Sequence, residues 1–137
     1  MVLASNTRPP QGHPLTEREL LRDIAIFELE NGITLGIFGL IGEDAVSVAS
    51  DTGDFEFLDR HQTAQNMIET SQGSNVDIIV AITHSSLDED IDLAQNVSGI
   101  DIIVGGHSHT VLSERSLWVI PSSYRPGITT FTWDNWN

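Results

Sequence analysis

Two continuous apolar runs on either side of an amphipathic segment constrain this chain more than any other feature. Residues 76–83 read VDIIVAIT and residues 100–104 read IDIIV, and both runs are rich in β-branched side chains. Such runs are typical of strands that are buried on both faces of a sheet. The segment between them places four apolar side chains on one helical stripe: Leu87, Ile91, Ala94 and Val97. The order predicts a strand–helix–strand (βαβ) unit with a parallel strand pair.

The ends of the helix in this unit are also marked in the sequence. Ser86 and Glu89 have the spacing of a capping box, in which each residue's side chain satisfies the other's backbone amide. Asp88, Glu89 and Asp90 suit the positive end of the helix dipole. Gly99 is expected to end the helix before the second strand begins.

The rest of the chain gives weaker signals. Asn31-Gly32 is a strong hairpin signal and predicts antiparallel strands at about 23–30 and 33–40. We further expect short strands at 2–5 and 117–120, a surface helix between Asp59 and Ser71, and loops at 6–14 and 41–58. The predicted fold class is therefore α/β, with a βαβ unit and an N-terminal β-hairpin, in a single domain over residues 1–137. Residues 121–137 show no pattern that can be assigned, and residues 113–137 as a whole are interpreted as a divergent tail.

Composition excludes several functions. The chain has 137 residues, with 20 acidic residues against 6 basic ones, a net charge of −14, no lysine and no cysteine. A field of that sign repels nucleic acid, so a nucleic-acid partner is not expected. The absence of cysteine excludes disulfides and thiolate zinc sites, and the absence of lysine excludes a P-loop. The acidic surface either maintains solubility or attracts divalent metal ions. The N-terminus lacks the pattern of a signal peptide, and no apolar run is long enough to span a membrane.

Three of the five histidines follow the predicted buried strands. His84 comes directly after the first strand, and His107 and His109 come after the second, behind Gly105-Gly106. Ligands gather at the carboxyl ends of parallel strands, and residues two apart in an extended segment project to the same side. We therefore predict a metal site formed by His84, His107 and His109, with zinc, manganese or iron as the ion. The other two histidines, His13 and His61, are interpreted as surface residues.

At this point the sequence resembles a known family. The stretch VDIIVAITHSSLDEDIDLAQNVSGIDIIVGGHSHT is similar to the second half of the calcineurin-like metallophosphoesterase domain of 5′-nucleotidases and UDP-sugar hydrolases. GITLGIFGLIG and the opening VLASN resemble the segments that precede it there, so the resemblance covers residues 1 to about 112. It implies a partial metallophosphoesterase-type α/β sandwich that hydrolyses phosphoesters, commonly of nucleotides, with two divalent metal ions.

The resemblance also implies a role for each histidine. His84 and His107 would bind one metal ion, and His109 would bind the other. No ligand role is transferred to Asp92 or Asp101. Members of the family are often exported, but the compartment of this chain is left open.

The departures from the family pattern are equally informative. The family's first half supplies a D-x-H pair, a bridging aspartate and a G-N-H-E-like motif, and no counterpart is assigned here. No G-N-H occurs, the one Gly-Asp pair is Gly53-Asp54, and Thr83-His84-Ser85-Ser86 replaces the commoner T-H-x-G. Three neutral imidazoles cannot offset the repulsion between two dications.

Two hypotheses follow. The first is an incomplete hydrolase domain, inactive alone, whose missing half is encoded upstream or supplied by a partner chain. The second is a non-catalytic metal-binding or interaction module derived from the same family. A single ion held by three histidines is chemically possible, but it would require a rearrangement of the family geometry. The sheet edge of a half-domain would also be open to association.

Overall fold

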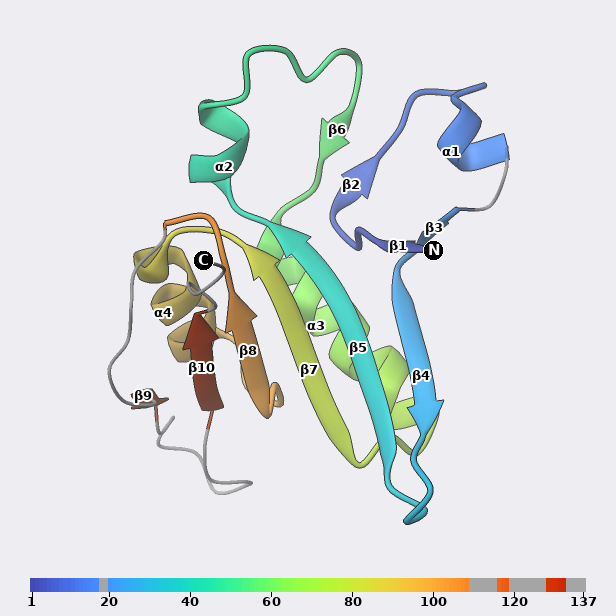
Figure 1. Cartoon of the computed structure of the whole chain (residues 1–137), viewed down its shortest axis with the longest axis vertical. Coiled ribbons are helices and arrows are strands. Elements are labelled where there is room, and N and C mark those ends of the chain that lie inside the picture. The colour runs from blue at the N-terminus through green and yellow to red at the C-terminus, as the bar shows by residue number, and fades with distance from the viewer. Residues whose placement is uncertain (18–19, 109–115, 119–127, 133–137) are drawn as a thin grey trace, which may run out of the picture.

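One mixed sheet organises the molecule (Figure 1). The computed structural model describes residues 1–17, 20–108, 116–118 and 128–132, the last two segments as backbone only. Six strands follow the order β4-β5-β7-β8-β10-β9. Their bounds are β4 Ile24–Glu28, β5 Thr34–Ile41, β7 Ile78–His84, β8 Ile102–Gly105, β9 Ser116–Trp118 and β10 Ile128–Thr132. An α/β fold class is therefore confirmed.

The predicted supersecondary units are present. β7 and β8 pair in parallel and are joined by helix α4 (Leu87–Asn96), which begins with the capping box between Ser86 and Glu89. β4 and β5 pair antiparallel around Asn31-Gly32, and Gly32 has φ of 81°, a conformation that favours glycine. The helix ends earlier than expected, because Val97 is its C-cap residue.

A second crossover was not predicted. β5 pairs in parallel with β7, and helix α3 (Arg60–Gly73) connects them. The helix itself was expected, but the strand order was not, because the hairpin signal shows only that β4 and β5 are neighbours. β5 therefore lies between its hairpin partner and β7.

Both long helices pack on one face of the sheet, behind it in the view of Figure 1. Phe38 of β5, Ala81 of β7 and Ile103 of β8 are fully buried and line this face. They meet Ile68 of α3 and Leu93 of α4, each 1% exposed. Burial of a side chain of this size contributes about 1.5–3 kcal/mol. This layer is the hydrophobic core of the described residues.

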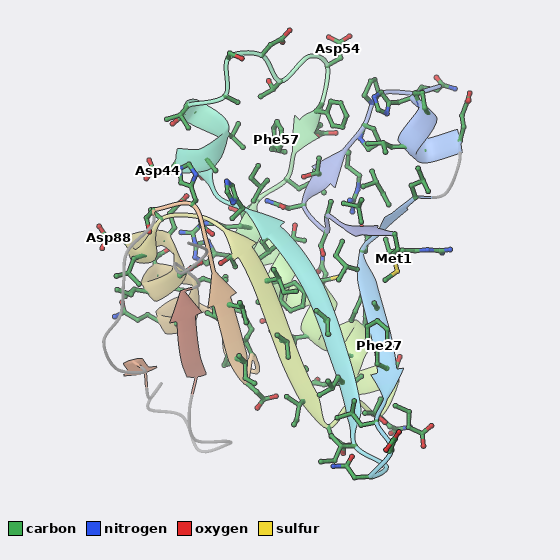
Figure 2. The ribbon with its side chains drawn as sticks, in the orientation of Figure 1. Met1, Phe27, Asp44, Asp54, Phe57 and Asp88 are labelled. Carbon is green, nitrogen blue, oxygen red and sulfur yellow. The ribbon has the colours of Figure 1, made fainter. Side chains whose placement is uncertain are left out.

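The opposite sheet face is also apolar, and no described helix covers it (Figure 1). The strand register places nine apolar side chains on it: Ala25, Phe27, Leu35, Ile37, Ile78, Val80, Ile82, Ile102 and Val104. Phe27 and Ile82 are 44% and 46% exposed. Figure 2 shows side chains standing on this side of the sheet, with Phe27 labelled on β4. We call this surface the open face.

Several short elements differ from the predicted loops. Residues 41–58 contain helix α2 (Glu43–Ser47) and strand β6 (Glu56–Phe57), which pairs with β2 (Thr7–Arg8). A single turn, α1 (Pro14–Glu17), follows β2, and β1 (Val2–Leu3) pairs with β3 (Leu21–Arg22). These pairings of two residues each join distant segments, so they leave no local periodicity. Within the described part of the chain, no helix has the length and apolar character needed to cross a membrane.

Candidate metal-binding edge of the sheet

His84 and His107 meet at the carboxyl ends of β7 and β8. The Nε2 atom of His84 lies 3.2 Å from the Nδ1 atom of His107. The ring centroids are 4.8 Å apart with an interplanar angle of 65°, so the rings meet edge to face. His84 is exposed and His107 is half-buried. We call this pair the histidine edge.

The backbone conformation of His107 makes this meeting possible. His84 extends the row of β7 residues that faces the open side, whereas Ser85, the next residue, is buried. Ser85 and His107 form a parallel β-bridge, so regular alternation would direct His107 to the same side as Ser85. His107 instead has φ of 79°, in the left-handed region, which breaks the alternation after β8. Such a conformation costs about 1–3 kcal/mol in a residue other than glycine.

The geometry of the pair suits a shared cation. Metal–nitrogen bonds of about 2.0–2.1 Å place two nitrogens of one tetrahedral site a little over 3 Å apart. The observed separation of 3.2 Å fits that requirement. Without a cation, one nitrogen must carry a proton and donate it to the other. Among the described residues, however, no group of three or more His, Cys, Asp or Glu side chains converges on one point. The pair supplies part of a ligand set.

The other histidines are accounted for separately. His109 lies outside the described residues, so its predicted role stays a prediction. His13 is half-buried, with its ring edge to face against Phe55, and its Nδ1 atom accepts a hydrogen bond from the Leu15 amide. His61 is on α3, with Nε2 2.8 Å from a carboxylate oxygen of Asp92. Both histidines are thus more enclosed than surface residues.

The chain does contain one Asp-x-His triplet, Asp59-Arg60-His61, at the beginning of α3. The Asp59 side chain accepts a hydrogen bond from the Gln62 amide at 2.7 Å and caps the helix. Arg60 binds Asp92 of α4, and His61 Nε2 lies beside the same carboxylate without forming a hydrogen bond to it. The triplet therefore fastens α3 to α4, and it is a structural feature rather than a counterpart of the family's D-x-H ligand pair.

Asp101, like Asp92, has a structural partner. Its carboxylate accepts a hydrogen bond from the Ile79 amide at 2.8 Å, at the amino end of β7. This is the opposite end of the strand from the histidine edge.

A buried carboxyl group lies behind the histidine edge. Asp90, in the first turn of α4, is 1% exposed, and its Oδ1 atom accepts a hydrogen bond from Ser85 Oγ at 3.1 Å. Burial raises the pKa of Asp90 from 3.8 to about 6, while contacts with the Thr83 and Ser85 hydroxyls act in the opposite direction. The sequence indicated Asp90 only as an acidic residue suited to a helix N-terminus, and it gave no sign of burial.

The neighbouring Glu89 joins two helices. Its carboxylate accepts hydrogen bonds from the Ser86 amide at 2.9 Å and from the Glu43 amide, at the start of α2, at 2.7 Å. Burial acts to raise the pKa of Glu89, but hydrogen bonds from the amides of Ser86, Asp44 and Glu43 outweigh it, so the pKa lies below 4.5. A Cβ atom on Gly42 would lie 2.3 Å from Glu89 Oε2, so this approach requires glycine. Ser86, which stands where the T-H-x-G pattern has glycine, is thus the N-cap residue of α4.

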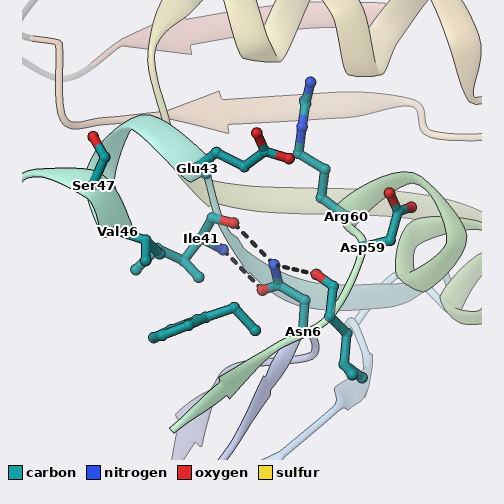
Figure 3. A pocket seen from close by; sticks show the side chains of 10 residues that line it. Asn6, Ile41, Glu43, Val46, Ser47, Asp59 and Arg60 are labelled. Carbon is teal, nitrogen blue, oxygen red and sulfur yellow. Dashed lines mark hydrogen bonds between the residues drawn. The ribbon is translucent and has the colours of Figure 1, made fainter. Parts of the chain in front are cut away.

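A cavity of about 430 Å³ opens beyond the carboxyl end of β5, between α2, β6 and the start of α3 (Figure 3). Asn6 stands at its base, donating from Nδ2 to the carbonyl oxygens of Ile41 and Leu58 and accepting from the Ile41 amide. Arg60 is bound to Asp92 and to the carbonyl oxygen of Glu89. The Asn6 and Arg60 side chains at this cavity are therefore engaged by other groups of the protein.

Comparison with solved structures defines the class of fold. The chain aligns over 96% of its length with NAD nucleotidase (NadN) of Haemophilus influenzae, with a TM-score of 0.81 and 23% identity, and covers 28% of that chain. It aligns equally with the 5′-nucleotidase precursor of Thermus thermophilus, with a TM-score of 0.83 and 24% identity, covering 27% of that chain. These likenesses establish a metallophosphoesterase-type fold.

Comparison with curated sequences identifies the family, although no family model matches the chain. The chain is 38% identical over 85 residues to the trifunctional nucleotide phosphoesterase YfkN of Bacillus subtilis, and 33% identical over 82 residues to 5′-nucleotidase of Diplobatis ommata. It is 31% identical over 117 residues, 85% of its length, to a Treponema pallidum protein that carries the name "Probable 5′-nucleotidase". Matched segments make up 6%, 14% and 19% of these relatives. Together with the shared fold, these sequence identities show that the chain belongs to the calcineurin-like 5′-nucleotidase family.

Proposed function

We propose that this chain supplies one side of a divalent-metal site in a phosphoester hydrolase of the 5′-nucleotidase type. The observation that carries the proposal is the histidine edge, where two imidazole nitrogens lie 3.2 Å apart at the carboxyl ends of neighbouring parallel strands. The family relationship supports hydrolysis of a nucleotide or another phosphoester. A bound dication would polarise the phosphate and activate a water molecule.

The residues of this chain would bind and orient the ion. His84 would contribute Nε2 and His107 would contribute Nδ1, both as neutral ligands. Imidazole ligands suit zinc, manganese or iron. His109, which follows two residues after His107, is proposed as a ligand of a second ion. The remaining ligands, including a bridging carboxylate, would come from sequence outside residues 1–137.

The charge distribution favours a cation at this end of the molecule. Figure 2 shows Asp44, Asp54 and Asp88 at the end toward which β5, β7 and β8 point. The chain as a whole carries a net charge of −14. Such a field attracts divalent metal ions and repels a phosphate group. Bound dications would be needed to reverse this repulsion before an anionic substrate could approach.

Equilibrium dialysis against Mn²⁺ or Zn²⁺ tests the metal site. We expect His84→Ala and His107→Ala each to weaken binding by at least about tenfold, since each removes a ligand worth about 1.4 kcal/mol or more. His13→Ala is the matched control, because this histidine packs against Phe55 instead. Equal binding by all four proteins would refute the proposed ligands.

A hydrolysis assay tests the catalytic part. The chain would be mixed or fused with a polypeptide that carries the D-x-H and G-N-H-E motifs and assayed on a nucleoside 5′-monophosphate. We expect metal-dependent release of phosphate only in the presence of both parts. Adjacent coding sequence without these motifs, and no separate chain that supplies them, would argue against a divided enzyme.

The second candidate is a non-catalytic metal-binding or interaction module. It is favoured by the lack of a third described ligand at the histidine edge. Tight, histidine-dependent metal binding without turnover in the completed domain would support this module over the hydrolase.

A further inference from the structure

We infer that Asp90 is a positioning residue, which acts through Ser85 to hold the backbone of His107 in the conformation that brings its imidazole to His84. The three links are the Asp90–Ser85 hydrogen bond, the Ser85–His107 β-bridge and the contact between the two rings. The inference deepens the proposed function and rests on it, since it concerns the placement of the same two imidazoles.

Asp90 is buried at a cost in free energy. The residue is 1% exposed, and its neighbour Glu89 carries a charge of the same sign. The Thr83 and Ser85 hydroxyls stabilise the ionised carboxyl group only in part, and among the described residues Arg60 adds the smallest effect of those acting on Asp90. A buried carboxylate with so little compensation is costly, so packing alone does not account for an aspartate at this position.

Ser85 is held by contacts with both Asp90 and the segment around Gly42. Its side chain is 3% exposed and lies between Asp90 and Gly42, where a Cβ atom on the glycine would come within 2.6 Å of Ser85 Cβ. The Ser85 hydroxyl donates to Asp90, while the neighbouring His84 carbonyl oxygen accepts a hydrogen bond from the Gly42 amide at 3.0 Å. The end of β7 is therefore fixed from both sides.

The backbone of His107 is strained. Its φ of 79° is unfavourable for a residue with a side chain and needs external support. The β7–β8 ladder ends at the Ile82–Val104 pair, so the isolated bridge between Ser85 and His107 is the pairing that anchors this turn to the end of β7. If Ser85 is released from Asp90, we expect the turn to relax toward a conformation in which the two rings separate.

The test compares Asp90→Ala and Ser85→Ala with the unchanged chain by NMR without metal. The readouts are the nuclear Overhauser effect between the His84 and His107 rings and their ¹⁵N shifts. We expect the ring-to-ring effect to fall severalfold in both variants, and Asp90→Asn, which keeps an oxygen acceptor for Ser85, to restore it. Asp88→Ala is the matched control, because Asp88 occupies the same helical turn but does not contact Ser85 in the described structure.

The outcomes separate the inference from the proposed function. Rings that stay together in folded Ser85→Ala or Asp90→Ala would overturn the inference, even if metal binding depends on both histidines. Rings that separate in these variants, while the original chain binds no metal, would support the inference and count against the metal site. If Asp90→Ala does not fold, Ser85→Ala, which keeps the Cβ atom, decides the question. Separation of the rings in Asp88→Ala would also contradict the inference.

Discussion

His107 and Asp90 both have unfavourable states that the surrounding residues maintain. His107 adopts a left-handed backbone conformation, and Asp90 is a carboxyl group enclosed by α4 and the end of β7. They lie on either side of Ser85, within one short chain of contacts. Unfavourable conformations and buried ionisable groups cluster at functional sites, because there the loss of stability is offset by a gain in function.

Because of Asp90, the free energy of unfolding should fall as the pH rises through the mildly acidic range. The pKa of Asp90 is about 6 in the folded state and 3.8 in the unfolded chain. The folded state therefore binds more protons between these values, and its contribution to stability falls as the pH rises from about 4 to about 6. The difference corresponds to about 3 kcal/mol. We expect the stability of Asp90→Asn to change less with pH between about pH 4 and pH 6. At pH 7 this variant should be at least as stable as the original chain.

Urea unfolding at pH 4.5 and pH 7 checks this expectation. Asp88→Asn provides the same change of charge in the same helical turn, away from Ser85, and should leave the slope unchanged. A clear loss of stability in Asp90→Asn at pH 7 would show that the carboxylate form contributes favourably to folding.

At the scale of elements, Glu89 links the starts of α2 and α4. We expect Glu89→Ala to reduce the free energy of unfolding by about 2 kcal/mol, since removal of each helix cap costs about 1 kcal/mol. Glu89→Gln should be less destabilising, because it retains an oxygen acceptor. Thermal or urea unfolding measures both effects, with Asp88→Ala as the control in the same turn. Equal stability of Glu89→Ala and Asp88→Ala would contradict the proposal that Glu89 caps both α2 and α4.

The same carboxylate predicts a loss of stability in acid. The pKa of Glu89 in the folded state lies below 4.5, its value in the unfolded chain. Its contribution is therefore complete above about pH 4.5 and is lost as the pH falls through the folded value. Unfolding experiments below pH 4.5 should show a decline that is absent in Glu89→Gln.

Gly42 tests the geometry of this link. A methyl group there would collide with the Glu89 carboxylate and with Ser85. We expect Gly42→Ala to destabilise the protein by an amount similar to Glu89→Ala. Because both changes break the same contact, the double variant should be destabilised by less than the sum of the two. Strictly additive effects in a double-mutant cycle would indicate that the two residues act independently.

The sequence predicted the elements best where local chemistry determines them. The Asn31-Gly32 turn, the cap at Ser86 and the β-branched strands β7 and β8 all follow from signals within a few residues. The β2–β6 pairing and the strand order depend on contacts between distant residues, which no periodicity records. At the site, the meeting of His84 and His107 was predicted from the parallel pairing of β7 and β8 in the βαβ unit, but the left-handed turn that produces it was not. Burial of Asp90 was equally invisible, since an acidic residue in a first helical turn is usually exposed.

At the scale of the whole molecule, the open face is the dominant feature. Parallel sheets normally have both faces covered, and exposed apolar patches mark surfaces of association. We expect the isolated chain to self-associate at micromolar concentration and to bind a hydrophobic dye. Ile82→Gln combined with Phe27→Gln should reduce both effects without unfolding the protein, because the two side chains are 46% and 44% exposed.

Size-exclusion chromatography with light scattering measures the association. Val48→Gln is a suitable control, since Val48 is 71% exposed but lies just after α2, away from the sheet. A stable monomer that does not bind the dye would show that the open face is already covered in the isolated chain.

The position of β5 between β4 and β7 has a consequence for the order of folding. The β4–β5 hairpin closes over a short turn, whereas the β5–β7 and β7–β8 pairs are connected through the helices α3 and α4. Closure over longer segments costs more entropy and is slower. We therefore expect the hairpin to form first and to serve as the template on which β7 and then β8 assemble. Since His84 is the last residue of β7 and His107 follows β8, we expect the histidine edge to form later than the hairpin.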